Sequence, residues 1–238
     1  MKRPSASAAE LELYRGIKRA IAERRLQPGV KLAEDALATL FKVSRARVRK
    51  VLLLLASDHI VRHEPNRGAF VWKPSVSEAR NILAARRLVE CYLVRQSAAL
   101  ITKPQILNLR SILVQEQEAR KADDNPRMMR LSGEFHSALA ECAENQILSE
   151  FLARLISQSY LILAVYQRRD VDICPQDDHA SIVDQLEAGD SETAEKVLNV
   201  HFDHIEAELN LKDMPETNAL DLSSILQPPA VPYFRGET

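Results

Sequence analysis

Two short helical patterns lie only a few residues apart near the start of the chain. Apolar residues recur at helical spacing over residues 34–41 and again over residues 45–57, and only three residues, ending in Ser44, separate them. Ser44 is a favourable N-cap for the second helix. Two helices joined by so short a turn form the outline of a helix-turn-helix, which restricts the fold of this end of the chain more than any other feature.

The segments on either side complete a winged form of this motif. Residues 11–25 have helical periodicity and end before the turn dipeptide Pro28-Gly29. Residues 60–72 contain two short β-type runs on either side of a turn that contains Pro, Asn and Gly. We therefore predict a winged helix-turn-helix with a small β-hairpin over residues 1–73.

The rest of the chain has the pattern of an all-α bundle. After a predicted linker at residues 74–76, prolines separate long amphipathic segments, and we find no convincing strand. The chain is therefore predicted to be mainly α, with a six-helix domain over residues 77–212 and an extended or disordered proline-containing tail over residues 213–238. The predicted helices cover residues 77–101, 104–123, 126–144, 147–169, 176–188 and 191–212.

Charge divides the chain at the same place. Residues 1–74 contain 16 lysines and arginines against 7 aspartates and glutamates, a net charge of +9. Residues 75–238 contain 16 and 26 respectively, a net charge of −10. A positive field on a small domain favours a polyanionic partner, although an unevenly charged solvated surface would give the same composition.

Composition excludes several other classes of protein. Only 6 glycines and 5% aromatic residues argue against a β-rich or nucleotide-cradling fold. The longest apolar run, residues 51–56, is too short to cross a bilayer, and no hydrophobic segment follows Met1, so we expect neither a membrane span nor a secretory signal. Cys91, Cys142 and Cys174 are expected to be reduced thiols of a cytoplasmic protein.

Four cations crowd the start of the second helix of the motif: Arg45, Arg47, Arg49 and Lys50. The amino terminus of a helix is already positive, so these side chains are unfavourable there unless an anion is bound. Arg45 and Arg49 are four residues apart and share a face, which in helix-turn-helix proteins enters the major groove of DNA. We assign these cations and Ser44 to DNA binding; the alternative is a solvated basic face.

A second DNA contact is predicted at the turn of the hairpin. Gly68 allows positive φ and a close approach of the backbone to a ligand, and Arg67 beside it could enter the minor groove. The alternative is an ordinary turn with a solvated arginine.

These residues resemble the GntR family of regulators over residues 11–73. In that family, arginines matching Arg45 and Arg49 and a glycine matching Gly68 contact operator DNA. This sequence departs from the family at Lys42, where Gly is usual, and at Ala46-Arg47, where Thr-Pro is common. The resemblance is carried by Ile17–Ile21, Leu26–Gly29, Leu32–Glu34, Leu37-Ala38, Phe41–Arg45, Val48-Arg49 and Asn66–Val71.

Histidines suggest a second site in the helical part. His136, His179 and His201 fall on separate predicted helices, from which they could converge on the core, whereas a lone helical histidine is usually structural. Imidazole suits Zn, Ni, Cu or Fe. His204, one turn past His201, is expected at the surface or behind the site.

Residues 75–212 are similar to the FCD effector domain of the FadR-type branch of the family, and six helices would place them in its VanR-like subgroup. The resemblance is carried by Arg86–Glu90, Phe135-His136, Glu144–Leu148, His179–Ile182, Gly189-Asp190, Ala194 and His201. Many such domains bind one divalent metal through one Asp and three His, and His136, His179 and His201 match the three His. The Asp position is occupied by Ser132, so the resemblance implies a site without its anionic ligand.

Two arrangements of this site remain open. Three neutral imidazoles can still hold Zn or Ni, with a carboxylate effector in the open position, or the histidines can bind an acidic effector without metal. In the family, an Arg matching Arg86 meets the effector carboxylate; a helical ion pair with Glu90 is the alternative. Asn145, in a matching stretch, is included among the predicted effector-binding residues.

The predicted protein is a sequence-specific regulator, most often a repressor in the family. We expect a homodimer that binds a short palindrome in double-stranded DNA and responds to a small organic acid. Two alternatives are a metal-dependent enzyme on a helical bundle and an architectural DNA-binding protein with no effector. The sequence has neither a His-Glu-x-x-His motif nor a Glu-x-x-His pair of the di-iron type, so we predict that it is not an enzyme.

Overall fold

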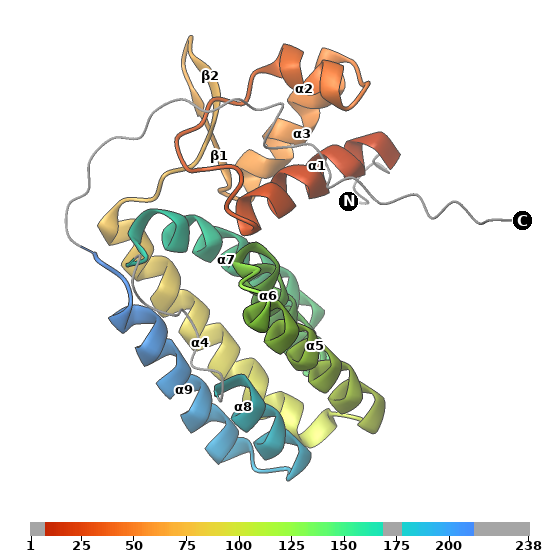
Figure 1. Ribbon diagram of the computed structural model, residues 1–238, viewed down its shortest axis with the longest axis vertical. Coiled ribbons are helices and arrows are strands. Elements are labelled where there is room, and N and C mark those ends of the chain that lie inside the picture. Colours follow the sequence, from red (N-terminus) through yellow and green to blue (C-terminus); the bar gives the residue numbers. More distant parts are fainter. Residues whose placement is uncertain (1–7, 169–177, 212–238) are drawn as a thin grey trace, which may run out of the picture.

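A computed structural model describes residues 8–168 and 178–211, which form two packed parts (Figure 1). The first part consists of α1 (Ala8–Ala22), α2 (Glu34–Leu40), α3 (Arg45–Ser57), β1 (Val61–Glu64) and β2 (Gly68–Val71). The second part consists of α4 (Val76–Leu100), α5 (Lys103–Lys121), α6 (Asn125–Glu141), α7 (Gln146–Tyr166), α8 (Asp178–Glu187) and α9 (Ser191–Ala207). The predicted fold class, a winged helix-turn-helix followed by an all-α six-helix bundle, is confirmed in these residues.

The first part is a small three-helix core with a hairpin on one side. Leu13 and Ile17 of α1, Leu37 of α2 and Leu52 of α3 are fully buried against one another's helices. β1 and β2 pair antiparallel, from Val61 opposite Val71 to Glu64 opposite Gly68. The segment before α2 adds a short third edge, because the backbone N–H of Leu32 donates to the carbonyl of Ala69 at 2.8 Å.

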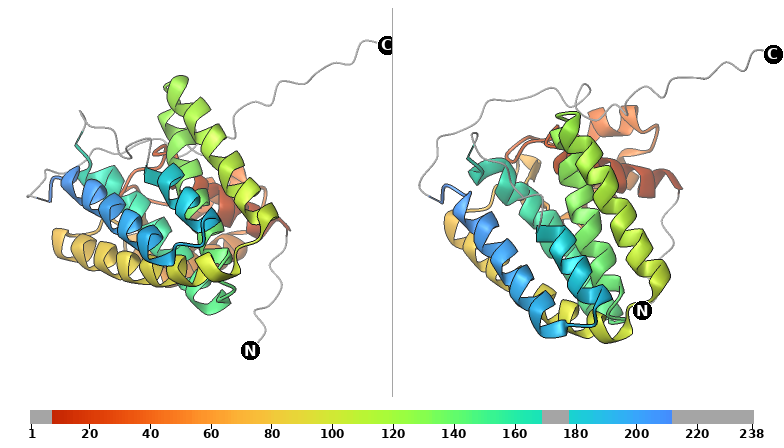
Figure 2. Two further views of the ribbon diagram at one scale, coloured as in Figure 1. Left: turned by 90° about the horizontal axis from the view of Figure 1, so that it is seen from below. Right: turned by 60° about the horizontal axis from the view of Figure 1, so that its bottom comes forward.

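The second part is built around α4, the longest helix. Ser75 and Glu78 form a reciprocal capping box at its start, which accounts for the abrupt change from linker to helix. α4 packs against α6, α7 and α9, while α5 packs on α6 and α8 (Figures 1 and 2). Phe135 of α6 and Phe202 of α9 are the largest fully buried side chains.

The predicted helices 147–169 and 191–212 are too long at their carboxyl ends. α7 ends at Tyr166 and α9 at Ala207, and Gln167 and Leu209 then pair as an isolated antiparallel bridge. The N–H of Asn210 donates to the carbonyl of Tyr166 at 2.7 Å, so contacts between the two ends replace the next helical turn. The predicted tail at 213–238 and Cys174 lie outside the described residues; Cys91 and Cys142 are buried free thiols.

α7 is long and apolar enough to span a membrane, with a mean hydropathy of 1.3 over its most apolar window. Half of that window is buried inside the protein, because α7 packs against α4 and α6. This is the behaviour of a core helix of a bundle.

α7 also joins the two parts of the molecule. Its Gln158 donates from Nε2 to the carbonyl of Asp58, the C-cap residue of α3, at 3.1 Å, and Nε of Arg154 lies 3.4 Å from the carboxylate of Asp58. The hydroxyl of Tyr14 in α1 donates to the same carboxylate at 2.5 Å. The buried Asp58 therefore connects the end of α3 to both α1 and α7.

The close approach of α6 and α7 depends on Gly133. A Cβ at this position would lie 1.6 Å from Oη and 2.6 Å from Cζ of Tyr160 in α7. We predict that Gly133→Ala lowers the free energy of unfolding by about 1–3 kcal/mol, because the two helices must separate or Tyr160 must move. Chemical denaturation followed by circular dichroism measures this change.

The matched control is Gly16→Ala, also inside a helix, where the new methyl meets only the ring edge of Phe41 at 3.1 Å. Since Ala favours helices over Gly, this control should keep or raise stability. Equal stability of Gly133→Ala and the control would contradict the proposed steric constraint.

Candidate nucleic-acid interface and buried histidine site

The start of α3 faces solvent. The side chain of Ser44 accepts a hydrogen bond from the N–H of Arg47 at 3.4 Å, which is the predicted N-cap. The side chains of Arg45, Arg47 and Arg49 are 68%, 53% and 64% exposed. The opposite face of α3, including Val48 and Leu52, is buried, so the fold turns the cations outward.

Each of these cations has an acidic neighbour from α1 or α2. Arg49 makes the most complete contact, donating from Nε and Nη2 to the two carboxylate oxygens of Glu34 at 3.0 and 2.8 Å. This hydrogen bond is the main reason that the pKa of Glu34 is lowered. The other pairs are Arg45 with Asp35, Lys50 Nζ with Glu10 Oε2 at 2.8 Å, and Arg47 Nε with Glu10 Oε1 at 3.8 Å.

The hairpin presents its predicted residues at and beside its turn. Arg67 is ion-paired with Glu64 and lies over the ring of Phe70, with its guanidinium carbon 5.2 Å from the ring centroid. Gly68 has φ +102°, a conformation that favours glycine, and follows the turn as the first residue of β2. The exposed Arg67 and the positive φ of Gly68 are therefore adjacent at the turn.

The three predicted histidines meet inside the bundle. His136 of α6, His179 of α8 and His201 of α9 each place one ring nitrogen in a group whose members all lie within 4.8 Å of one another. Their exposed fractions are 1%, 3% and 0%. Two nitrogens bound to one Zn²⁺ lie roughly 3.3 Å apart, so small movements of the rings would close this group around an ion.

A carboxylate lies against Nδ1 of every one of these histidines. The contacts are His136 with Glu90 Oε2 at 2.7 Å, His179 with Glu116 Oε2 at 3.1 Å, and His201 with Asp178 Oδ2 at 3.2 Å. Metal-binding histidines usually donate their second N–H to such a group, which fixes the tautomer and aims the other nitrogen at the ion. Among the described residues, the buried Nε2 of His201 has no hydrogen-bond partner, while His136 Nδ1 and Glu90 Oε2 are close but lack hydrogen-bond geometry.

Arg86 lies within this cluster. Its Nε donates to Glu90 Oε1 at 2.6 Å, and both side chains are buried. Burial alone would raise the pKa of Glu90, but the charge of Arg86 and the contact with His136 outweigh it and lower the pKa to about 2. The structure shows the helical ion pair of Arg86 with Glu90, in the interior and not at the surface, and an effector contact of Arg86 stays a prediction.

The electrostatics of the cluster suit a cation. Burial lowers the pKa of His136 to about 4 and that of His201 to about 3, so both rings are neutral at pH 7 and can offer lone pairs. With neutral imidazoles, the formal charges of Arg86 and of the three carboxylates sum to −2. A divalent ion would cancel that buried charge, so the residues present fit a metal although Ser132 offers no anion.

Residues 9–71 match the family described as bacterial regulatory proteins, gntR family, and residues 81–204 match the FCD domain. The chain belongs to the GntR family and carries an FCD domain. It is therefore a transcriptional regulator and not an enzyme, as the sequence predicted.

Relatives and solved structures agree with this family. The chain is 27% identical over 198 residues to the HTH-type transcriptional repressor RspR of Escherichia coli K12, covering 82% of this chain and 86% of RspR. It is similar in fold to E. coli McbR/YncC, with a TM-score of 0.74 at 20% identity over 84% of this chain and 96% of the other. A GntR regulator from Rhodococcus sp. RHA1 matches with a TM-score of 0.72 at 25% identity over 84% and 97%.

Other predicted residues of the FCD domain lie around the histidines or away from them. Ser132 is on α6, one turn before His136, and is half-buried. His204 is partly exposed and its Nδ1 contacts Asp178 Oδ2 at 2.8 Å, so it stands behind the site. Asn145 is the N-cap of α7 and accepts from the N–H of Leu148 at 3.1 Å; an effector contact for it stays a prediction.

Sequence reasoning missed Glu116 and Asp178. Glu116 is buried on α5 in line with Leu109 and Ala119, so an acidic residue interrupts an apolar stripe, and that interruption was the available signal. Asp178 directly precedes His179, but nothing in the sequence shows that it contacts His201 on another helix.

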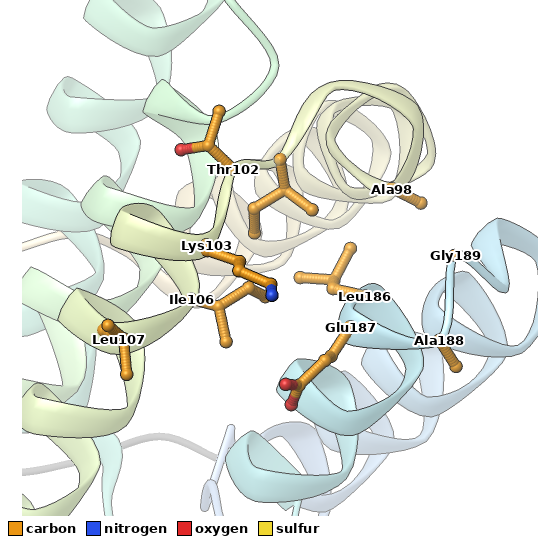
Figure 3. A pocket seen from close by; sticks show the side chains of 10 residues that line it. Ala98, Thr102, Lys103, Ile106, Leu107, Leu186, Glu187, Ala188 and Gly189 are labelled. Carbon is orange, nitrogen blue, oxygen red and sulfur yellow. The ribbon is translucent and has the colours of Figure 1, made fainter.

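A separate cavity of about 410 Å³ lies where α4 turns into α5, beside the end of α8 (Figure 3). Apolar residues dominate it, with Lys103 and Glu187 among those that line it. None of the predicted effector-binding residues lines this cavity.

The buried histidines give the metal-free protein a specific pH dependence. Folding lowers the pKa of His136 and His201, so the unfolded chain binds more protons than the folded chain below the ordinary histidine pKa of about 6.5. The free energy of unfolding therefore reaches its full value, as far as these histidines contribute, only above that pH. We predict that the free energy of unfolding falls as the pH drops from 7 to 5, by up to about 1.4 kcal/mol per pH unit for each histidine.

Denaturant titrations of EDTA-treated protein at several pH values measure this slope. His136→Asn should reduce it, whereas His63→Asn, on the exposed hairpin, should leave most of it in place. A flat profile, or stability that rises toward pH 5, would show that the histidines are not buried as neutral rings.

Proposed function

We propose that this FCD-domain regulator is a cytoplasmic repressor. Its α3 helices and hairpins would bind a short palindromic operator, and a small carboxylate-bearing metabolite in the helical domain would control the affinity. The observation that carries this proposal is that one chain combines two features: an exposed cationic start of α3 and a buried cluster of histidines and carboxylates in the bundle. Two relatives are named as repressors, RspR and the gluconate operon repressor of Bacillus subtilis, and they favour repression over activation for this chain.

The DNA contact rests on Ser44, Arg45, Arg47, Arg49 and Lys50 of α3. The helix start offers N–H groups and guanidinium groups to the same anion, and an arginine there can bind guanine O6 and N7 with two parallel hydrogen bonds. Arg67 and Gly68 at the hairpin would add a contact to the adjacent groove. All of these arginines are exposed and none lies in the hydrophobic core.

A divalent ion, zinc or nickel, would be held by His136, His179 and His201. When bound, it supplies a positive centre with an open position for an anionic group. Glu90, Glu116 and Asp178 orient the three rings and balance the charge. A pocket in which the histidines bind the acid without metal is the second candidate, and it is favoured by the absence of an Asp at position 132.

An effector acts only if it binds two arrangements of the protein differently. Here α7 lies between the site and the DNA-binding part: Tyr160 packs on Gly133, one turn before His136, while Gln158 and Arg154 contact Asp58 at the end of α3. A change in the packing of α6 on α7 would therefore be felt at the end of α3.

A homodimer would bring two α3 helices to one palindrome. The outer face of α4 supports such a contact, because Leu88 and Tyr92 are exposed apolar side chains one turn apart. Two copies of one patch make a twofold interface, which matches the symmetry of a palindrome.

The metal proposal predicts about one zinc per chain. Protein made without a polyhistidine tag, dialysed against zinc and then against buffer, should retain it, and His179→Ala should not. Glu116→Gln should weaken zinc affinity about 10- to 100-fold, because it leaves the ligands intact but removes the carboxylate that orients His179. Elemental analysis and competition with a chelating dye measure both effects.

The matched control is His63→Ala, an exposed histidine outside the bundle. Zinc retained by His179→Ala, or lost equally by the control, would contradict the three-histidine site and leave the metal-free pocket as the explanation.

The DNA-binding proposal is tested with Arg49→Ala. Selection from a randomised duplex library with the unchanged protein should first yield a palindromic sequence. We predict that Arg49→Ala weakens binding to that sequence about 5- to 100-fold, because a bidentate base contact is lost, while the helical circular dichroism is unchanged.

Lys196→Ala, which removes an exposed cation on α9, serves as the control and should bind as the unchanged protein does. Unaltered operator affinity of Arg49→Ala would remove α3 from the interface. Release of the operator by a screened set of organic acids, and its absence after His136→Ala, tests effector control.

A further inference from the structure

Glu34 brings a negative charge to the surface that the proposed function assigns to DNA. It lies in the first turn of α2, and both of its carboxylate oxygens are bound by Arg49 of α3. We propose that Glu34 is a positioning residue for base recognition, which holds Arg49 so that the remaining edge of its guanidinium points at a guanine. This inference rests on the proposed function and explains how the protein would select guanine at one position of its DNA site.

The atoms of the contact determine what Arg49 has left to offer. Glu34 uses Nε and one N–H of Nη2, at 3.0 and 2.8 Å, which is the side edge of the planar guanidinium. The end edge, formed by Nη1 and the second N–H of Nη2, remains with two parallel donors. Two parallel donors are what O6 and N7 of guanine accept, so one arginine can bind Glu34 and guanine at once.

The fold supports a fixed geometry for this pair. The turn between α2 and α3 is short, with the N–H of Val43 bonded to the carbonyl of Ala38 at 3.0 Å. Glu34 is half-buried at the start of α2, whereas the side chain of Arg49 is mostly exposed. The carboxylate is therefore the anchored partner, and a long side chain that would otherwise sample many rotamers is restrained before DNA binds.

A simpler explanation accounts for only part of this arrangement. The N-cap of α2 is Ala33, which provides no side-chain hydrogen bond, so acidic residues in the first turn stabilise the helix through its dipole. Glu34 and Asp35 both meet that requirement. The dipole does not require both oxygens of Glu34 to lie on Arg49.

If Glu34 positions Arg49, its removal should change affinity for random DNA and selectivity for one base in opposite directions. A carboxylate near DNA phosphates weakens binding to every sequence, so removing it should strengthen or leave unchanged the binding to random duplexes. If Glu34 positions Arg49, its removal should at the same time weaken the preference for guanine at one position of each half-site. A purely structural residue would not separate the two effects.

The experiment uses the full-length protein and a randomised duplex DNA library, with sequencing of the bound fraction. Arg49→Ala identifies the base position that Arg49 contacts. We expect Glu34→Gln to lower the guanine preference at that position about three- to tenfold, with random-duplex affinity equal or higher. Asp35→Asn is the matched control, because it removes the same charge from the same turn but leaves the Arg49 contact in place.

A second variant tests whether the length of the side chain matters when its charge is kept. Glu34→Asp keeps the charge and the helix-dipole effect but shortens the side chain by one methylene, so it should weaken the same base position although net charge is unchanged. The double variant Glu34→Gln with Arg49→Ala should show no loss at that position beyond that of Arg49→Ala alone. Circular dichroism and thermal unfolding of each variant establish that it is folded; if Glu34→Gln does not fold, Glu34→Asp decides.

Three results would overturn the inference. They are an unchanged base preference in Glu34→Gln and Glu34→Asp, an equal loss at the same position in Asp35→Asn, and a further loss in the double variant. If the unchanged protein enriches no sequence at all, the proposed function fails, and the inference fails with it. A motif that depends on Arg49 but not on Glu34 overturns the inference alone.

Discussion

Charged side chains gather around the three buried histidines, and their need for partners sets how the helices of the bundle pack. Three carboxylates and one guanidinium lie among the buried histidines, where an unpaired charge would cost several kcal/mol. The chain meets this cost with direct contacts: Arg86 on Glu90, and one carboxylate on each histidine. The contacts tie α4, α5, α6, α8 and α9 to a single point, so the position of five helices is linked to what occupies that point.

The surface proposed to bind DNA also pairs its charges, but in contact with solvent. Cations at the start of α3 are paired with acids of α1 and α2, and the pairs are exposed, so they orient side chains more than they stabilise the fold. An exposed pair costs little free energy to open, whereas a buried pair of the bundle costs several kcal/mol. The exposed pairs therefore restrain individual side chains, whereas the buried cluster restrains whole helices.

α7 connects the two regions through side-chain packing on one side and polar contacts on the other. α7 lies on α6 through Tyr160 over Gly133, and it holds the C-cap of α3 through Gln158 and Arg154. A closely packed helix cannot deform continuously, so a small shift on one side is passed on as a movement of the whole element. The uneven charge of the chain, basic in front and acidic behind, is consistent with this division of tasks.

The fold class, the helix-turn-helix and the hairpin could be predicted from the sequence, because these depend on local periodicity, turn residues and caps. The set of three histidines was implied by the family resemblance, and the packing of α6, α8 and α9 brings them together. The sequence did not determine the carboxylates that face the histidines, since Glu116 and Asp178 come from helices whose rotation and contacts are set only when the bundle packs. It also did not determine that the ion pair of Arg86 with Glu90 is buried, or that Glu34 meets Arg49 across the turn. Only tertiary structure decides such contacts, because side chains far apart in sequence or on different helices meet through packing geometry and not through spacing along the chain.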